Sequence, residues 1–260
     1  MEIKQKMVII TGASSGIGRA TALEFARRGA NVVLAARRAA ELENVAVQCR
    51  SLGVDARVIP ADVTKREDCF ALIARAGEVD VLVNNAGFGI FDPIETAKPE
   101  DAEQMMATNY FGALHCTQAV LPQMLERRSG SIVFNSSIAG LMGYTNMGTY
   151  GATKFAITGF AEALRDEVIR RGVQVALVCP GTTETNFFMK AERKKLPGAS
   201  RLIPGIRPES VARALCDAAI DGRYRRILPF NAMLFVRLKE FFPRFAHSMF
   251  RRVSFMMERR

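Results

Sequence analysis

Tyr150 and Lys154 are the residues of this sequence whose types and spacing most directly suggest chemistry. They lie four positions apart in TYGATKFAITG (149–159), where alanines and regularly spaced apolar residues predict a helix that continues to Gly172. Residues four apart on a helix share a face, so a phenol and an ammonium at these positions can serve one site. The same spacing also arises by chance on ordinary helices. The elements around the pair must therefore decide its meaning.

Six short apolar, β-branched runs alternate with helical patterns along the chain. The predicted strands are 7–10, 31–35, 56–60, 79–83, 131–134 and 173–178. Regular alternation of strand and helix predicts a parallel, doubly wound α/β sheet, whose strands are buried on both faces and therefore consist of continuous apolar runs. We expect a single domain over 1–228 with a sheet of about seven strands, followed by a helical extension over 229–260.

Composition excludes several classes of protein. The five cysteines are odd in number, scattered and without a Cys-x-x-Cys spacing, which favours a reducing compartment over a disulfide framework. With two histidines in addition, we expect no metal site. The first apolar run is too short for a signal peptide, and no uncharged apolar stretch of membrane-spanning length occurs. We therefore expect a cytoplasmic protein, unless a peripheral segment attaches it to the inner face of a membrane.

A glycine turn follows the first predicted strand. TGASSGIG places Gly12, Gly16 and Gly18 immediately before a predicted helix. The N-terminus of a helix offers unpaired N–H groups and a positive dipole to an anion, and glycines let the main chain approach a pyrophosphate. The spacing is G-x-x-x-G-x-G rather than G-x-G-x-x-G, and glycine turns also serve plain strand-to-helix packing. Its place on the first strand and helix favours nucleotide binding.

The end of the second strand should indicate which dinucleotide is bound. A carboxylate there would accept from the 2′-hydroxyl of NAD. The strand ends in LAARR, which puts Ala36 at that place and Arg37 directly after it. A guanidinium can bind a 2′-phosphate, so this end predicts NADP. The alternative is that Arg37 and Arg38 form a solvated strand end.

Two further segments follow strands at the edge where ligands gather in such folds. ADV (61–63) follows the third strand, and NNAG (84–87) follows the fourth. Asp62 could accept from the adenine amino group. Asn84 and Asn85 could instead be ordinary turn formers.

TGASSGIG, NNAG, GSIVFNSSIAG, YGATK and PGTTET occur in one order and spacing that resembles the short-chain dehydrogenase/reductase family, over roughly residues 6–228. The resemblance implies a Rossmann-like fold and an NADP-dependent oxidoreductase that interconverts a carbonyl and an alcohol. By position, Tyr150 resembles the family's general acid/base, and Lys154 its partner that lowers the phenol pKa and binds the nicotinamide ribose. Ser137 resembles the residue that hydrogen-bonds the substrate oxygen, with Ser136 as the alternative register. Asn109 resembles the helix residue that holds a water against the lysine.

The resemblance also implies a set of nucleotide-binding residues. Pro180, Gly181 and Thr185 match the segment that holds the nicotinamide carboxamide and phosphate, whereas Thr183 stands where Ile or Val is more usual. The implied set is Gly12, Ser14, Ser15, Gly16, Ile17, Gly18, Arg37, Asp62, Val63, Asn84, Ala86, Gly87, Tyr150, Lys154, Pro180, Gly181, Thr183 and Thr185.

The chain departs from the family's bacterial 3-oxoacyl-carrier-protein reductases after the last strand. There it more closely resembles reductases of lipophilic ketones and alcohols. TNFFMKAERKK (185–195) stands where the family has its substrate lid, and its Phe187, Phe188 and Met189 suit an apolar substrate, unless they are simply core. The family commonly pairs through the helices of Asn109 and Tyr150, which implies a homodimer or homotetramer. The alternative function is a nucleotide-sensing regulator with little turnover.

The basic charge of the chain belongs to its C-terminal end. Residues 222–260 hold ten Lys or Arg against two Glu, a net charge of +8, which leaves +2 for the first 221 residues. Apolar residues recur there at helical spacing: Met233, Leu234, Leu238, Phe241 and Phe242, then Phe245, Met249, Val253 and Met256 beyond Pro243. An apolar stripe flanked by arginines suits an anionic membrane surface better than nucleic acid, so we expect no nucleic-acid partner. Packing on the substrate lid or on a second subunit is the other reading.

Overall fold

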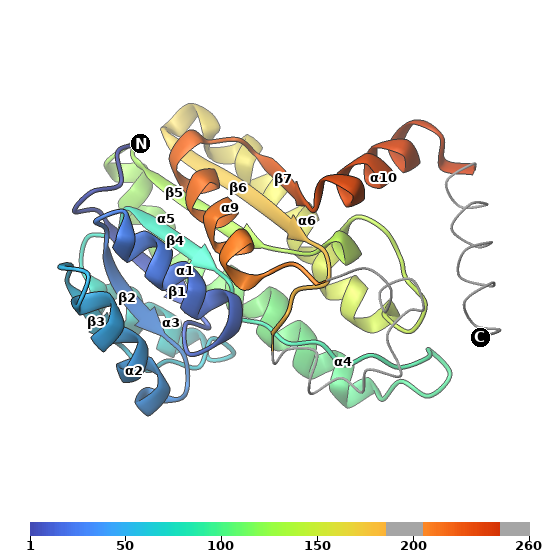
Figure 1. The fold of residues 1–260 in the computed structure, drawn as a ribbon, viewed down its shortest axis with the longest axis horizontal. Coiled ribbons are helices and arrows are strands. Elements are labelled where there is room, and N and C mark those ends of the chain that lie inside the picture. The colour runs from blue at the N-terminus through green and yellow to red at the C-terminus, as the bar shows by residue number, and fades with distance from the viewer. Residues whose placement is uncertain (186–204, 245–260) are drawn as a thin grey trace.

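The computed structural model describes residues 1–185 and 205–244. Seven strands form one sheet in the order β3-β2-β1-β4-β5-β6-β7, and every neighbouring pair is parallel (Figure 1). The direction of winding reverses between β1 and β4, which is where open sheets of this kind bind their ligands. The strands are β1 (Met7–Thr11), β2 (Asn31–Ala35), β3 (Ala56–Val58), β4 (Val81–Asn84), β5 (Gly130–Asn135), β6 (Val173–Pro180) and β7 (Arg225–Leu228).

Helices cover both faces of this sheet. One face packs against α1, α2 and α9, and the other against α3, α5 and α6. The helices are α1 (Gly16–Arg27), α2 (Ala39–Arg50), α3 (Arg66–Ala76), α4 (Pro99–Met106), α5 (Gly112–Glu126), α6 (Gly148–Val168), α9 (Pro208–Asp221) and α10 (Phe230–Phe241), with short turns η1 (Ala107–Phe111), η2 (Ile138–Gly140) and η3 (Ile169–Arg171).

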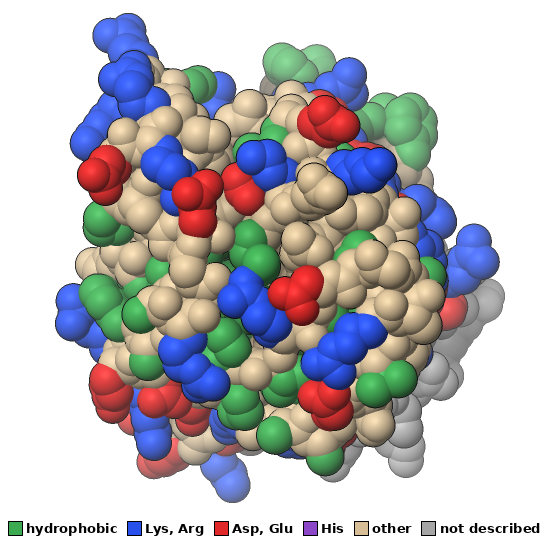
Figure 2. Space-filling view, turned by 90° about the vertical axis from the view of Figure 1, so that its left-hand side faces the viewer, with side chains coloured by type: hydrophobic (Ala, Val, Ile, Leu, Met, Phe, Trp, Pro, Cys, Tyr) green, Lys and Arg blue, Asp and Glu red, His purple; other side chains and the backbone are tan. Residues whose placement is uncertain are grey.

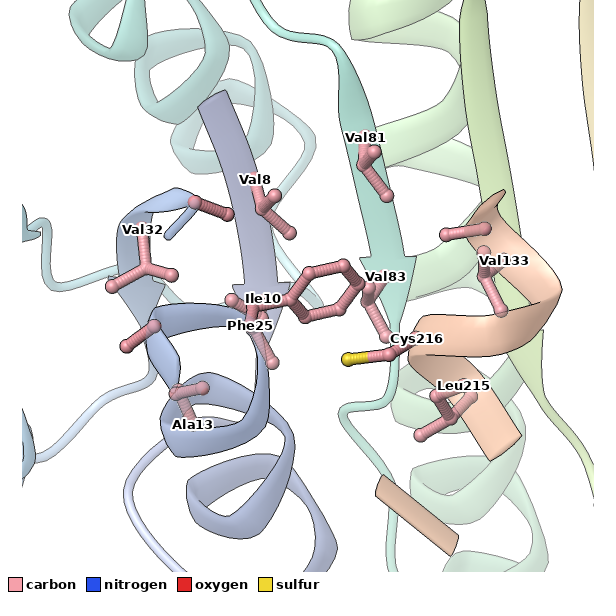
Figure 3. Close-up of a cluster of buried hydrophobic side chains, with 14 of the residues drawn as sticks. Val8, Ile10, Ala13, Phe25, Val32, Val81, Val83, Val133, Leu215 and Cys216 are labelled. Atoms are coloured by element: carbon pink, nitrogen blue, oxygen red, sulfur yellow. The ribbon is translucent and has the colours of Figure 1, made fainter. Parts of the chain in front are cut away.

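The core on the α1 side shows how the sheet is held. Figure 3 shows the ring of Phe25, from α1, between Ile10 of β1 and Val83 of β4, with Cys216 of α9 beside it. All four side chains are fully buried. Burial of apolar area is the main favourable term in folding, and this packing fixes α1, and with it the turn that precedes α1, against the sheet.

The fold prediction is confirmed: the chain is a single doubly wound, Rossmann-like domain with a seven-stranded parallel sheet. The helical pattern of the sequence over 99–125 forms three elements, which are α4, the π-helical turn η1 and α5. The prediction of about seven strands included a seventh, but the sequence did not show where it lies. This strand, β7, begins with two arginines rather than with an apolar run. A helix begins at Phe230, near the predicted start of the extension, while 245–260 and the predicted lid residues Phe187, Phe188 and Met189 lie outside the described residues.

Candidate active site

The carboxyl ends of β1, β4 and β5 are joined by a hydrogen-bond network centred on Asn85. Its side chain donates to the main-chain oxygen of Thr11 (2.9 Å) and accepts from Asn135 Nδ2 (2.8 Å). The Thr11 hydroxyl accepts from the main-chain N–H groups of Asn85 and Ala86 (3.0 Å each). The turn after β1 is thereby fixed relative to the turn after β4. From the sequence, Asn85 could have been an ordinary turn former, and no role was predicted for Thr11 or Asn135.

The glycine turn between β1 and α1 has no room for side chains at two positions. Gly12 has a φ of +67°, and a Cβ there would lie 2.9 Å from Ala86 Cα. A Cβ on Gly18 would collide with the carbonyl oxygen of Gly12. Ser15 is the N-cap residue of α1, and Ile17 packs partly into the core beneath it. The main chain is thus held so that the N-terminus of α1 can receive an anion.

Two arginines stand beside this turn, at the end of β2. Arg38 Nη2 donates to the Ser14 hydroxyl (3.3 Å), and its Nη1 pairs with Glu41 (3.2 Å). Arg37 is exposed, and Ala36 places no acid at the strand end. These guanidinium groups can bind a phosphate beside the glycine turn. The sequence singled out Arg37, whereas the structure brings Arg38 into contact with the turn itself.

Asp62, after β3, is held in a local turn. Its carboxylate accepts from the N–H (3.1 Å) and hydroxyl (2.8 Å) of Thr64. Burial alone would raise the pKa of Asp62, but these two hydrogen bonds and the nearby charge of Arg37 lower it overall, so the group is a carboxylate at neutral pH. The side chain of the next predicted residue, Val63, is buried in the core on the α3 and α5 side.

The side chains of NNAG diverge. Asn84 Nδ2 donates to the hydroxyl of Thr117 on α5 (3.1 Å), which directs this side chain away from the glycine turn. A cofactor contact of Asn84 would therefore use its main chain. Gly87 lies beside the catalytic candidates, because a Cβ there would lie 2.9 Å from Asn109 Oδ1 and 3.8 Å from Lys154 Nζ.

Tyr150 and Lys154 lie one turn apart on α6, and both are buried, with 5% and 6% of their surface exposed. Lys154 Nζ donates to the main-chain oxygen of Asn135 at the end of β5 (3.0 Å) and lies 5.8 Å from the centre of the Tyr150 ring. The Tyr150 ring meets Phe91 edge-to-face at 5.4 Å. The predicted pair therefore faces the ligand edge of the sheet.

The structure distinguishes the two adjacent serines after β5. The Ser137 hydroxyl hydrogen-bonds Tyr150 and donates to the main-chain oxygen of Pro180 (3.4 Å). The Ser136 hydroxyl instead donates to the main-chain oxygen of Lys154 within α6 (3.3 Å). Only Ser137 can share a substrate oxygen with Tyr150.

Burial shifts both titratable groups of the pair. It raises the pKa of Tyr150 well above that of a free phenol, and the hydrogen bond with Ser137 partly opposes this shift. Burial lowers the pKa of Lys154 to about 8. Lys154 is therefore mostly an ammonium at neutral pH, yet it can exchange its proton close to that pH.

Asn109 lies in the π-helical turn η1 and is buried. Its Oδ1 accepts from Phe88 N–H, and its Nδ2 donates to Phe88 oxygen (3.0 Å each) and to the Thr153 hydroxyl (2.9 Å). Thr153 in turn donates to the main-chain oxygen of Tyr150 (2.8 Å). Single π-helical turns are frequent at functional sites. Here the turn connects the loop after β4 to α6, and the predicted water relay stays a prediction.

Apolar side chains pack around Tyr150. The segment FGIF (88–91), directly after NNAG, supplies several of them, and this apolar run is the feature of the sequence that could have indicated the cluster. The cluster consists of Phe91, Met105, Ala139 and Tyr150, with Phe88, Ile90, Tyr144 and Met147 packed against it.

PGTTET brings the end of β6 across to the glycine turn. Gly181 N–H donates to Leu228 oxygen (2.7 Å), which connects the segment to β7. The hydroxyl of Thr183, the unusual residue, is turned back to Gly181 oxygen (3.1 Å), and its side chain is buried. The methyl group of Thr185 faces Gly16, at 3.3 Å from the position of a Cβ there. The segment predicted to bind the pyrophosphate and the segment predicted to bind the nicotinamide carboxamide therefore lie side by side.

These residues fit a nicotinamide dinucleotide. Within 1–185 and 205–244, Asn135 oxygen is the hydrogen-bond acceptor of the Lys154 ammonium, which has three N–H donors. Two donors can thus serve ribose hydroxyls. The glycine turn can receive the pyrophosphate, and the arginines can bind a phosphate on the adenosine ribose.

Comparison with known proteins agrees with this geometry. Residues 6–196 match the family model of the short chain dehydrogenases. The chain therefore belongs to the short-chain dehydrogenase/reductase family and is an oxidoreductase.

Three relatives show the range of similarity. An uncharacterized oxidoreductase of Listeria monocytogenes is 43% identical over 85% of this chain and 92% of its own length. A 3-ketodihydrosphingosine reductase of Bacteroides thetaiotaomicron is 33% identical over 93% and 94%, respectively. The human 17-beta-hydroxysteroid dehydrogenase 13 is 32% identical over 96% and 83%.

Two solved structures show the same fold with nucleotides bound. A short-chain dehydrogenase/reductase of Burkholderia phymatum in complex with NAD superposes with a TM-score of 0.83 at 27% identity, covering 92% of this chain and 94% of that one. A short-chain dehydrogenase of Sphingobium yanoikuyae in complex with NADPH gives 0.78 at 29% identity, covering 86% and 88%.

The buried ammonium predicts an unusual pH dependence of stability. We expect Lys154→Met to be more stable than the wild-type protein at pH 7, because it removes a buried charge. Between about pH 8 and 10.5 the unfolded wild-type chain still binds this proton while the folded protein does not, so wild-type stability rises with pH. One pKa unit corresponds to about 1.4 kcal/mol. The difference in free energy of unfolding between Lys154→Met and wild type should therefore narrow by a few kcal/mol over this pH range.

Thermal unfolding of both proteins at pH 7 and pH 10 measures this gap. Lys98→Met, at an exposed position, is the matched control and should leave the gap to wild type unchanged. A gap for Lys154→Met that does not vary with pH would contradict the burial of a charged Lys154.

Proposed function

We propose that the protein is an NADPH-dependent reductase that interconverts a carbonyl and an alcohol on a lipophilic small molecule. The observation that carries the proposal is the buried set of Tyr150, Ser137 and Lys154 beside an apolar cluster. A bound nicotinamide supplies the hydride to the carbonyl carbon.

The side chains of the site carry the proton chemistry. Tyr150 donates its proton to the carbonyl oxygen, and Ser137 donates a hydrogen bond to the same oxygen as negative charge develops there. The Lys154 ammonium, held by Asn135, stabilises the phenolate that remains and can return a proton, since its pKa lies at about 8. In the oxidative direction each transfer is reversed.

We expect Tyr150→Phe to slow turnover by roughly 10²- to 10⁴-fold, because a positioned acid contributes about that much. The affinity for NADPH should change little, since the ring and its packing on Phe91 are retained. Tyr224→Phe, whose ring packs against Arg165 instead, is the matched control and should keep wild-type turnover. Steady-state NADPH oxidation and nucleotide fluorescence measure the two effects. Unchanged turnover in Tyr150→Phe would remove Tyr150 from the mechanism.

The preference for NADPH is supported by the arginines at the end of β2. Arg38 reaches Ser14 in the glycine turn, and Arg37 is exposed next to it. A 2′-phosphate placed between them would receive charge-assisted hydrogen bonds, and no carboxylate stands at Ala36 to accept from a 2′-hydroxyl.

We expect Arg37→Ala and Arg38→Ala each to weaken NADPH binding by about 10- to 100-fold, the usual size of a charge-assisted hydrogen bond. NADH binding should change little. Arg213→Ala, on the exposed face of α9, is the control for the loss of one surface charge. Titration of both nucleotides, followed by fluorescence, measures the affinities. Equal losses for NADPH and NADH would show that these arginines do not recognise the 2′-phosphate.

A lipophilic substrate is supported by the apolar cluster around Tyr150 and by two relatives. Phe91 and Met105 are fully buried there, and Phe88 and Ile90 pack partly buried beside them. The names of the two relatives, a hydroxysteroid dehydrogenase and a ketodihydrosphingosine reductase, refer to lipophilic compounds.

Turnover should therefore rise with the apolar length of the substrate. In a series of methyl ketones assayed with NADPH, we expect kcat/KM to rise about three- to fourfold per added CH2, the transfer free energy of one methylene, until the site is filled. A flat or falling series would contradict an apolar site. An absence of turnover across this series and across steroid, retinoid and long-chain ketones would favour the nucleotide-sensing alternative.

Two further parts of the proposal concern assembly and location. Phe111, in η1, and Phe155, on α6, each expose 45% of their surface, which supports a homodimer or homotetramer formed through these helices. All five cysteines are free and buried, as suits a protein kept in the reducing cytoplasm.

A further inference from the structure

Helix α10 exposes three large apolar side chains. Phe230, Leu234 and Phe241 expose 69%, 53% and 73% of their surface. With the exposed Arg237 they occupy positions i, i+4, i+7 and i+11, which lie in one row along a helix. We call this row the outer face of α10. A surface helix of a soluble domain normally directs its large apolar residues inward, so three exposed ones in a single row indicate an interaction surface.

The inner face of α10 is fixed to the domain by specific contacts. Val236 is buried, and Lys239 Nζ donates to the main-chain oxygen of Leu141 (2.7 Å). Glu240 is the one acidic residue of the helix, and it pairs with Arg225 of β7 (2.7 Å) and with Arg237 (3.1 Å). The contacts of Val236 and Lys239 therefore determine which residues are left facing outward.

The surroundings of the outer face are basic. Residues 221–244 hold six Lys or Arg against Asp221 and Glu240, a net charge of +4, and Arg237 and Arg244 are exposed. The opposite end of the molecule differs: Figure 2 shows blue and red side chains interspersed over the face beside α2. Figure 1 shows α10 at the far end of the molecule from α2.

We propose that the outer face of α10 docks onto an anionic phospholipid bilayer. Phe230, Leu234 and Phe241 would enter the boundary between headgroups and acyl chains, while the basic side chains meet the lipid phosphates. The helix lies along the surface rather than crossing it: within 1–185 and 205–244, no helix is long and apolar enough to span a bilayer.

A bilayer suits this face better than a second copy of the chain. In a two-fold pairing of outer faces, the same patch meets itself, so Arg237, in the middle of the row, would lie near the Arg237 of the other copy. Anionic headgroups instead complement the positive charge. Through its inner face the same helix contacts Leu141, which follows η2, and Ala139 of η2 belongs to the apolar cluster around Tyr150.

The test is co-flotation of the full chain with vesicles of phosphatidylcholine, with and without phosphatidylglycerol, at low and high salt. We expect binding to the anionic vesicles that decreases with salt. Leu234→Glu/Phe241→Glu should lower the apparent affinity at least about tenfold, because two inserted side chains become charged. Val47→Glu/Leu52→Glu, which changes two exposed apolar residues at the α2 end, is the matched control and should bind like wild type.

Circular dichroism and NADPH binding of each variant establish that it is folded, independently of any substrate. A wild-type chain that stays in solution with anionic vesicles at low salt would overturn the proposal. Wild-type binding by Leu234→Glu/Phe241→Glu would overturn the assignment to α10. If this variant instead lowers the mass of the protein in solution while wild type binds no vesicles, the outer face is a contact between subunits.

Discussion

The buried ammonium group of Lys154 is the constraint on which the arrangement of the site depends. A charge taken out of water costs several kcal/mol unless polar groups surround it. Here the main-chain oxygen of Asn135, at the end of β5, accepts a hydrogen bond from the Lys154 ammonium. The amide of Asn135 then donates to Asn85, and Asn85 donates to Thr11 ahead of the glycine turn. The same short chain of hydrogen bonds therefore orients both Lys154, which we propose takes part in proton transfer, and the glycine turn, which we propose binds the cofactor. Because the carboxyl ends of parallel strands meet at one edge, three segments distant in sequence can take part in it.

The C-terminal part of the chain is coupled to the same edge. Leu228, the last residue of β7, accepts from Gly181 in the segment after β6, and α10 follows directly. The contact between Lys239 and Leu141 then joins α10 to the turn η2 beside the catalytic candidates. The helix is thus held in a definite orientation relative to the site. Because α10 is held in a fixed orientation, its exposed apolar side chains indicate a surface for a partner rather than a loosely packed end of the chain.

The sequence alone predicted the fold class and the main catalytic candidates. Continuous apolar runs located β1, β2, β5 and β6 to within two residues of their observed ends, because strands buried on both faces have little choice of residue. The spacing of Tyr150 and Lys154 placed both on one face of α6, since 3.6 residues complete a helical turn. β7 was not located, because its Arg225 and Arg226 sit at a half-buried sheet edge and pair with Glu240 and Asp221. The sequence does not indicate that Glu240 and Asp221 pair with these arginines.

Only the tertiary structure decided which of two adjacent residues faces the site. Ser137 rather than Ser136 contacts Tyr150, and Asn85 rather than Asn84 holds the glycine turn. Successive side chains at the end of a strand point to opposite sides, so the sequence narrows the choice to a pair, and the elements packed on each side select between the two. The same reason applies to α10. Its periodicity predicts an amphipathic helix, but which face turns outward depends on contacts made by Lys239 and Glu240 with residues about 100 and 15 positions away.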